Sequence, residues 1–392
     1  MNAIVGQSGG PTAAINATLA GVVRGCRGRL CHLYGMKNGI EGLLRKELVC
    51  LDYLFDNDGL LDLLASTPSA ILGSCRMRLP PFSDSSFYST LFGVLEEYSI
   101  DCFFYIGGND SMDTVARLNE YAQRNSIDVT FIGVPKTIDN DLVLTDHTPG
   151  YGSCAKYIAT TVAEIYRDVS VYRLPSVTVV EVMGRDAGWL GCACALPAAL
   201  SGGGCQLVYL PESGFSLDTI LSDAEGFLCK SPTLLIGLSE GALPDNSGGA
   251  DSFGHTRSSG GGRILEGAVS KFLGCKSRTV ELSLAQRCAA HLLSKTDIEE
   301  SVLIGRRAVD FAVDGKSGIM ASFRRRAGEY GVDVVAVDAS MVANRVKNVP
   351  HSFIDFENRF ITGECVDYLS PLILGEKQIK YKRGLPHYFK LR

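Results

Sequence analysis

Residues 105–112, YIGGNDSM, and residues 134–142, VPKTIDNDL, decide the fold. Each stretch closes a short β-rich run, DCFFYI in the first case and VTFIGV in the second. Small or turn-forming residues follow, and then acids, hydroxyls and a lysine. Polar groups at the exits of neighbouring parallel strands are typical of a phosphate and metal site at the carboxyl edge of a sheet. We therefore expect the two stretches to meet at one such edge.

The pattern of strand, turn and helix repeats along the chain with short loops, which favours βαβ units and a parallel sheet. Residues 3–10 are expected to form a strand and a glycine turn, with Thr12 capping the next helix. Strand ends at one edge converge in space, so their polar residues can meet. Five predicted strand ends pair a glycine with a charged or hydroxyl residue: Gly10 with Thr12, Gly73 with Arg76, Gly108 with Asp110, Gly184 with Arg185, and Glu240 with Gly241.

The rest of the pattern predicts further elements. Strands are expected over residues 69–78 and 332–340, and residues 297–330 are expected to be helical. A helix is expected to open at Ser111, after the GGND turn. The glycine- and serine-rich residues 246–262 predict a surface insertion.

Composition narrows the class of protein. A chain of 392 residues is long enough for two domains or one large α/β domain, and 46% hydrophobic with 21% charged residues is typical of a well-packed globular protein. A net charge of -5 gives no general attraction to nucleic acid or to an anionic membrane, so we expect neither as a partner.

Cysteine usage and the N-terminus favour the cytoplasm. The 13 cysteines are scattered without a CxxC pair, which favours reduced, buried thiols. The N-terminal residues read as a strand rather than a secretory signal, and no apolar run reaches about 18 residues, the length that a membrane span needs.

Two familiar nucleotide motifs fail. GYGSCA at 150–155 follows HTP instead of a strand, and GKS at 315–317 lacks the upstream glycine of a P-loop. What remains is the chemistry of phosphoryl transfer, which needs an anion cradle, a divalent cation, a base and positive charge. PKTIDND offers a lysine and two aspartates, and MGR offers an arginine. The alternative reading is that Asp139 and Asp141 only cap a turn and a helix.

At this point the chain resembles a known family. QSGGPTAAIN, LGSCR, IGGNDS, PKTIDND, VVEVMGR, RTVELSLAQR, FITGECVDYLSPLILGE and the glutamate after the LLIGLSEG strand resemble the phosphofructokinase family, specifically its pyrophosphate-dependent branch. The resemblance implies an α/β fold of two Rossmann-like, three-layer αβα domains with mainly parallel sheets and an active site in the interdomain cleft. It implies a phosphate-donor domain of residues 1–148 plus about 286–336, and a sugar-phosphate domain of 149–285 plus about 337–392.

The resemblance also implies roles for single residues. Asp139 matches the general base that takes the proton from the 1-hydroxyl of fructose 6-phosphate, and Mg²⁺ is the expected cofactor. The expected catalytic set is Asp139, Lys136, Arg185 and Asp110. The expected sugar-phosphate set is Thr137, Asp141, Met183, Gly184, Glu240, Arg278 and Arg287, with one of the two arginines reaching across a subunit boundary in a homodimer or homotetramer. The expected donor set is Gly10, Arg76, Gly108 and Ser111, and the expected metal ligands are Asn109 and Asp139.

The choice of donor is expected to depend on Asp110. ATP-using members of the family generally have glycine there, since the α-phosphate of ATP passes close to the backbone. A carboxylate occupies that space and repels the anion, and burying unpaired like charges would disfavour ATP by several kcal/mol. Lys136 replaces a second glycine and supplies charge to the transition state. The sequence therefore predicts pyrophosphate as the donor.

Three positions depart from the family pattern, namely Asn109, Ser176 and Leu284. They leave the affinity for the sugar phosphate and the allosteric behaviour open. The alternatives are an ATP-dependent phosphofructokinase, a phosphotransferase acting on another sugar phosphate such as sedoheptulose 7-phosphate, and a non-catalytic regulatory subunit.

Overall fold

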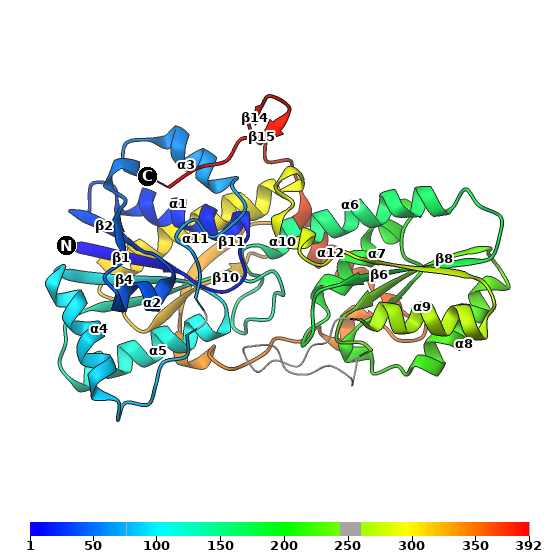
Figure 1. Ribbon diagram of the computed structural model, residues 1–392, viewed down its shortest axis with the longest axis horizontal. Coiled ribbons are helices and arrows are strands. Elements are labelled where there is room, and N and C mark those ends of the chain that lie inside the picture. Colours follow the sequence, from blue (N-terminus) through cyan, green and yellow to red (C-terminus); the bar gives the residue numbers. More distant parts are fainter. Residues whose placement is uncertain (76, 244–259, 392) are drawn as a thin grey trace.

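The computed structural model describes residues 1–75, 77–243 and 260–391 (Figure 1). Within these ranges the chain forms two units, each built on its own sheet. Arg76 and the part of the predicted insertion up to residue 259 lie outside the described residues.

The first unit contains a seven-stranded sheet in the order β11-β10-β5-β4-β1-β2-β3. β1, β2, β4, β5 and β10 pair in parallel, while β3 and β11 at the two edges are antiparallel to their neighbours. The strands are β1 Asn2–Gln7, β2 His32–Met36, β3 Leu48–Cys50, β4 Ile100–Gly107, β5 Thr130–Pro135, β10 Ile319–Arg325 and β11 Val332–Asp338.

Alternate residues of this sheet pack against different helices. Phe104 and Ile106 of β4 share a core with α1, α3 and α11, whereas Phe103 and Tyr105 share a core with α2, α4 and α5. Since side chains of a strand alternate between the faces of a sheet, the two cores make a three-layer unit. The helices are α1 Ala13–Cys26, α2 Gly39–Leu44, α3 Asp58–Ala65, α4 Ser85–Glu97, α5 Asn109–Arg124 and α11 Lys295–Val313.

The second unit repeats this plan with a smaller sheet. Its strands are all parallel, in the order β7-β8-β6-β9. One face packs on α6, α7 and α12, and the other packs on α8 and α9. The elements are β6 Ser176–Val182, β7 Leu207–Tyr209, β8 Thr233–Ser239, β9 Lys276–Glu281, α6 Tyr151–Val169, α7 Trp189–Ser201, α8 Leu217–Leu228, α9 Gly261–Phe272, α10 Ala285–Cys288 and α12 Gly363–Leu369. The expected fold, two three-layer αβα units with mainly parallel sheets, is confirmed.

Short elements complete the described chain. Two small hairpins are β12 Ile354–Asp355 with β13 Phe360–Ile361, and β14 Tyr381–Lys382 with β15 Leu385–Pro386. The 3₁₀ turns are η1 Asp52–Leu54, η2 Pro211–Ser213, η3 Ala290–Leu292, η4 Ala339–Met341, η5 His351–Phe353 and η6 Ser370–Ile373.

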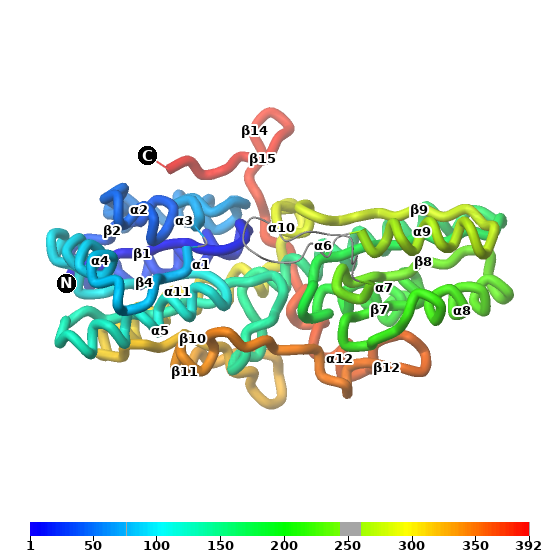
Figure 2. The backbone as a smooth tube through the Cα atoms, turned by 60° about the horizontal axis from the view of Figure 1, so that its bottom comes forward, coloured from blue at the N-terminus to red at the C-terminus, as the bar shows by residue number. Residues whose placement is uncertain are grey.

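The two units lie side by side along the long axis, with α10 and α12 near the junction (Figure 2). The domain boundaries stay a prediction. The C-terminal residues return to the first unit, whereas the family resemblance implies that about 337–392 belong to the second. Phe389 is buried in the core of α1 and α3, and its N–H donates to Thr67 Oγ1 at 2.9 Å.

Three local expectations are wrong. The described residues of 69–78 form no strand; an isolated bridge between Ser8 and Cys75, and a hydrogen bond from the Leu72 N–H to Gln7 Oε1 at 2.9 Å, join them to the region of β1. Residues 319–325 were expected to be helical but form β10. The pattern did not reveal this strand, because a short run that is buried on both faces lacks the alternation of apolar and polar residues that marks a strand. Helix α5 begins at Asn109 instead of Ser111, so Asn109 and Asp110 lie in its first turn.

The cysteine prediction holds in part. All thirteen cysteines are free, but Cys31, Cys50, Cys229 and Cys288 are exposed rather than buried. No helix in the described part of the chain is long and apolar enough to cross a membrane.

Two glycines set the crossing of α1 and α11. A Cβ added at Gly21 would lie 2.2 Å from the Val302 carbonyl oxygen, and one at Gly305 would lie 2.2 Å from the Thr18 carbonyl oxygen. The two backbones therefore approach too closely for any side chain. This contact fixes α11, and thereby the chain that returns from the second unit, against α1.

We predict that Gly21→Ala lowers the free energy of unfolding by about 1–3 kcal/mol, because the added methyl group must push α11 away. Gly93→Ala is the matched control, since no heavy atom lies within 4 Å of a Cβ there and the exposed helix position favours alanine. Chemical denaturation of both variants checks the prediction. Equal stability of the two would contradict it.

Candidate active site

A cavity of about 180 Å³ lies where loops of the two units meet. The first unit contributes Gly10 and Thr12 after β1, and 136–139 after β5. The second unit contributes Met183 after β6, Glu240 after β8 and Arg287 from α10. Each strand concerned presents its carboxyl end to the cavity, as open α/β sheets do to their ligands. Larger grooves of about 550 and 640 Å³ lie elsewhere on the first unit, but none of the predicted site residues lines either of them.

One part of the cavity wall is organised around Lys136. Its side chain is 3% exposed, and its ammonium group donates a hydrogen bond to the Gly10 carbonyl. Arg287 approaches the same turn so closely that a Cβ at Gly10 would lie 3.0 Å from its Nη1. Arg287 Nε is buried without a hydrogen-bond partner. Two cations thus converge on one glycine turn, which is suited to binding phosphate.

Asp139 lies at the floor of the cavity on the turn after β5. Its N–H donates to Thr137 Oγ1 at 3.1 Å, which fixes the turn locally. Burial, together with the nearby carboxylates of Asp141 and Glu240, raises the pKa of Asp139 to about 7. The cations of Lys136 and Arg185 oppose that shift. A carboxyl group with a pKa near neutrality suits a general base.

The opposite wall is built by loops of the second unit. Gly184 has a φ of 113°, which favours glycine, and its carbonyl accepts from Ser239 Oγ at 2.6 Å. The Met183 N–H donates to Gln286 Oε1 at 3.2 Å. Burial raises the pKa of Glu240, and the positive charge of Arg185 opposes it. These bonds hold the loop of residues 183–185 (the MGR loop) rigid beside the loop after β5, residues 136–150 (the Asp139 loop).

The donor loop holds the predicted metal ligand Asn109. Gly108 caps α5, and Ser111 is 2% exposed beneath Gly107. Asn109 Nδ2 donates to the Arg345 carbonyl at 2.6 Å, while its Oδ1 is buried without a partner, as is Oδ1 of Asp141. No group of three or more His, Cys, Asp or Glu side chains in the described ranges forms a protein-only metal cage. Unpartnered oxygens of this kind fit Mg²⁺, which commonly takes one or two carboxylates and completes its shell with phosphates and water.

Asp110 differs from the expectation of a buried, unpaired carboxylate. Its side chain is 44% exposed, and Oδ1 lies 3.9 Å from Nη2 of Arg78. The first turn of α5 points it toward solvent and toward the loop after residue 76. The electrostatic part of the argument against ATP is therefore weakened by screening, and the steric part remains.

Arg278 is the predicted residue that lies apart. It is exposed on β9, opposite Thr178 of β6. Together with Tyr172 and Leu174 it lines a separate cavity of about 240 Å³. The cavity therefore brings together Gly10, Lys136, Thr137, Asp139, Met183, Glu240 and Arg287. Other predicted residues of the described chain do not line it, namely Gly108, Asn109, Asp110, Ser111, Asp141, Gly184 and Arg185, and Arg278 lines the separate cavity.

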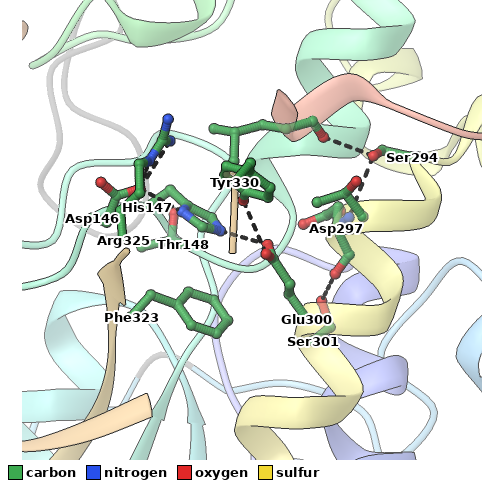
Figure 3. A network of polar contacts seen from close by, with 12 residues as sticks. Asp146, His147, Thr148, Ser294, Asp297, Glu300, Ser301, Phe323, Arg325 and Tyr330 are labelled. Atoms are coloured by element: carbon green, nitrogen blue, oxygen red, sulfur yellow. Dashed lines mark hydrogen bonds and ion pairs between the residues drawn. The ribbon is translucent and has the colours of Figure 1, made fainter. Parts of the chain in front are cut away.

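A buried polar network that the sequence interpretation missed lies beneath the Asp139 loop (Figure 3). The His147 ring is 2% exposed, and its nitrogens lie 2.8 Å from Asp146 Oδ1 and 2.8 Å from Glu300 Oε2. Arg325 bonds the same oxygen of Asp146 at 3.0 Å, and Tyr330 Oη donates to Glu300 Oε1 at 2.9 Å. The network joins the loop to α11 and β10. Its members are dispersed over 146–330, so spacing alone gives no signal of them.

Asp297 anchors the end of the same loop. Its carboxylate accepts from the Gly150 N–H at 2.8 Å and from the Ser153 N–H at 3.2 Å. Thr148 Oγ1 donates to the Thr137 carbonyl at 2.8 Å, which ties the two ends of the loop together. The loop that carries Asp139 is thus held from α11 on one side and by its own cross-bond on the other.

We predict that the network stabilises the fold in a pH-dependent way. Burial alone would lower the pKa of His147, but its bonds to Asp146 and Glu300 raise it above the ordinary value of 6.5. A folded-state pKa above the unfolded value means that this stabilisation is present below pH 6.5 and is lost as pH rises through the folded-state pKa. The difference in melting temperature between the native protein and His147→Gln should therefore be largest at about pH 5.5 and shrink toward about pH 9. His351→Gln, at an exposed histidine, is the control. A difference that stays constant or grows with pH would contradict the network's assigned charges.

The fold and the cavity define a class, the two-unit α/β enzymes whose catalytic groups come from strand ends of both units. The chain belongs to the phosphofructokinase family, whose profile matches residues 2–312. A pyrophosphate–fructose 6-phosphate 1-phosphotransferase from Halomonas elongata is 38% identical, with 100% of this chain and 96% of that protein covered. A sulfofructose kinase from Alkalicoccus urumqiensis is 30% identical, with 91% and 92% covered. The crystal structure of a pyrophosphate-dependent phosphofructokinase from Nitrosospira multiformis has a TM-score of 0.90 and 36% identity, covering 99% of this chain and 95% of that one.

Proposed function

We propose that this protein transfers a phosphoryl group from pyrophosphate to the 1-hydroxyl of fructose 6-phosphate, giving fructose 1,6-bisphosphate and phosphate, in a reversible reaction of glycolysis and gluconeogenesis. The observation that carries the proposal is Asp139, a carboxyl with a pKa of about 7 between Lys136 and Arg185 in the cavity shared by the two units. The full-length similarity to pyrophosphate-dependent relatives supports the donor and the sugar.

In this mechanism Asp139 accepts the proton of the sugar's 1-hydroxyl as that oxygen attacks phosphorus. The bond between the transferred phosphorus and the bridging oxygen of pyrophosphate breaks, and phosphate leaves. Lys136 and Arg185 stabilise the negative charge that develops on the transferred group. Thr137, Asp141, Met183, Gly184 and Glu240 orient the sugar, and Gly10, Arg76, Gly108 and Ser111 surround the donor.

A divalent metal, which we propose to be Mg²⁺, would be held by Asn109 and Asp139 and would supply positive charge to the donor phosphates. The buried, unpartnered Oδ1 of Asn109 supports this assignment. The chain itself provides few ligands, so binding of metal and of pyrophosphate should depend on one another.

We further propose a homodimer or homotetramer in which Arg278 binds the 6-phosphate held by a neighbouring subunit, while Arg287 binds it within the chain. Tyr172 and Leu174, which line the same cavity as Arg278, are 59% and 76% exposed, and such exposed apolar side chains support an interface. Thirteen free thiols support a reducing compartment, which we propose to be the cytoplasm.

A coupled assay with pyrophosphate and with ATP tests the function. We expect turnover with pyrophosphate and fructose 6-phosphate, and a loss of about 10²- to 10⁴-fold in kcat for Asp139→Asn because the proton acceptor is removed. Asp128→Asn, at an exposed aspartate away from the cavity, is the control. Turnover with ATP but not with pyrophosphate would show that the proposed donor is wrong. Turnover only with sedoheptulose 7-phosphate would show that the proposed sugar is wrong. Sugar binding without turnover under either donor would indicate a regulatory subunit.

Two substitutions at Asp110 separate the ways in which it disfavours ATP. Because the carboxylate is 44% exposed and lies 3.9 Å from Arg78, we expect its size to matter more than its charge. Asp110→Gly should then raise kcat/KM for ATP by at least about tenfold, whereas Asp110→Asn should leave it within about threefold. Steady-state kinetics with both donors measures this. An equal gain in the two variants would show that charge dominates, and no gain in either would remove Asp110 from donor choice.

A further inference from the structure

Lys347 lies on the segment that crosses from the first unit to the second. The segment follows β11 and η4 and leads to η5 and β12, and Figure 2 shows this stretch of chain passing between the units. Lys347 does not line the cavity of about 180 Å³ that contains Asp139. Any effect of this residue on catalysis must therefore pass through other residues.

The side chain of Lys347 reaches under the Asp139 loop. Its Nζ donates to Asn140 Oδ1 at 3.2 Å, to the Thr145 carbonyl at 3.2 Å and to the Asp146 carbonyl at 2.8 Å. Three accepting oxygens match the three N–H donors of an ammonium group. Burial lowers the pKa of Lys347 to about 7, and the carboxylates of Asp146 and Asp141 oppose that shift.

Asn140 shows why the loop needs such support. It lies between Asp139 and Asp141, is fully buried and has a φ of 54°, in the left-handed region that costs a non-glycine residue about 1–2 kcal/mol. A strained residue persists only where its surroundings determine its conformation. Asn140 Nδ2 also donates to Tyr368 Oη at 2.9 Å, so the loop keeps a second support if Lys347 is lost.

The backbone of Lys347 connects the second unit to the same loop. Its N–H donates to the Asp141 carbonyl at 2.7 Å, and its carbonyl accepts from Trp189 Nε1 at 2.8 Å. Its Nζ lies 5.0 Å from the centroid of the Trp189 ring. Trp189 begins α7, directly after the loop that carries Arg185. Lys347 therefore contacts both the loop that carries Asp139 and helix α7, which begins directly after the loop that carries Arg185.

We propose that Lys347 is a positioning residue that sets Asp139 against Arg185 across the junction of the two units. The inference rests on the proposed function for its catalytic meaning. Its physical basis is that a displacement of about 1 Å in a catalytic group can cost about 10²-fold in rate. Since Lys347 leaves the walls of the substrate cavity untouched, its loss should act on kcat more than on KM.

Lys347→Met tests the proposal, because it keeps the length of the side chain and removes the ammonium group. We expect kcat to fall about 10- to 100-fold while KM for fructose 6-phosphate and for pyrophosphate stays within about threefold. Lys347→Met added to Asp139→Asn should lower kcat by less than about threefold further, because its effect passes through Asp139. Lys230→Met, at an exposed lysine, is the control. An unchanged kcat, a change confined to KM, or two penalties that multiply in full would overturn the proposal.

A readout without catalysis separates this inference from the proposed function. Trp189 is the one tryptophan of the chain, so its fluorescence reports directly on the Lys347 contact. In Lys347→Met we expect a shifted emission maximum and at least about tenfold faster amide hydrogen exchange in residues 139–146. Trp189→Phe, which removes the Nε1 donor and makes the ring smaller but leaves the Lys347 ammonium group in place, should loosen the same loop to a smaller degree. If the native protein turns over neither donor but the loop is loosened in Lys347→Met, the proposed function is rejected and the positioning role of Lys347 stands. If fluorescence and amide exchange are unchanged in Lys347→Met, the positioning role of Lys347 is rejected, whatever activity is measured.

Discussion

The partial burial of the Asp139 carboxyl group is the constraint on which the rest of the site depends. A carboxylate withdrawn from water beside Asp141 and Glu240 is costly unless cations stand close to it. Lys136 comes from the same turn, but Arg185 comes from the other unit. The balance that leaves Asp139 with a pKa of about 7 therefore exists only while the two units keep their present separation. Chemistry and domain arrangement are coupled through one ionisable group.

The arrangement explains why so much of the polar interior serves support and not chemistry. Four residues that do not line the cavity and lie apart in the sequence, His147, Glu300, Tyr330 and Arg325, form one network of polar contacts (Figure 3). This network holds the end of the loop that carries Asp139. Close backbone contact between α1 and α11 at Gly21 and Gly305 places α11, which supplies Glu300 and Asp297 to this network. A loop that carries strain at Asn140 is held from α11, from β10 and from the crossing segment at once. This redundancy is what lets a strained turn remain in one conformation.

The charged groups near the Gly10 turn and on the first turn of α5 differ in their exposure to solvent. Lys136 and Arg287 converge on Gly10 in a narrow, buried place, whereas Asp110 faces partly into solvent on the first turn of α5. Under the proposed function, phosphate recognition belongs to the first place and exclusion of a larger donor to the second. The first depends on fixed charge at short range, and the second depends on space at the mouth.

The sequence by itself determined the fold class and the main strand-end residues, because alternating strand and helix periods and short glycine turns are local signals. It predicted that PKTIDND and MGR carry the chemistry, since the residue types match what phosphoryl transfer requires, and that assignment stays a prediction. It failed for residues 69–78 and for β10, where a non-regular segment and a short strand buried on both faces give no distinct period. Only the tertiary structure decided that Arg278 lies away from Arg287, that Asp110 is half exposed, and that Lys347 and His147 contact the loop that carries Asp139. Those facts depend on contacts between residues as far apart as 140 and 347, which have no expression in local pattern.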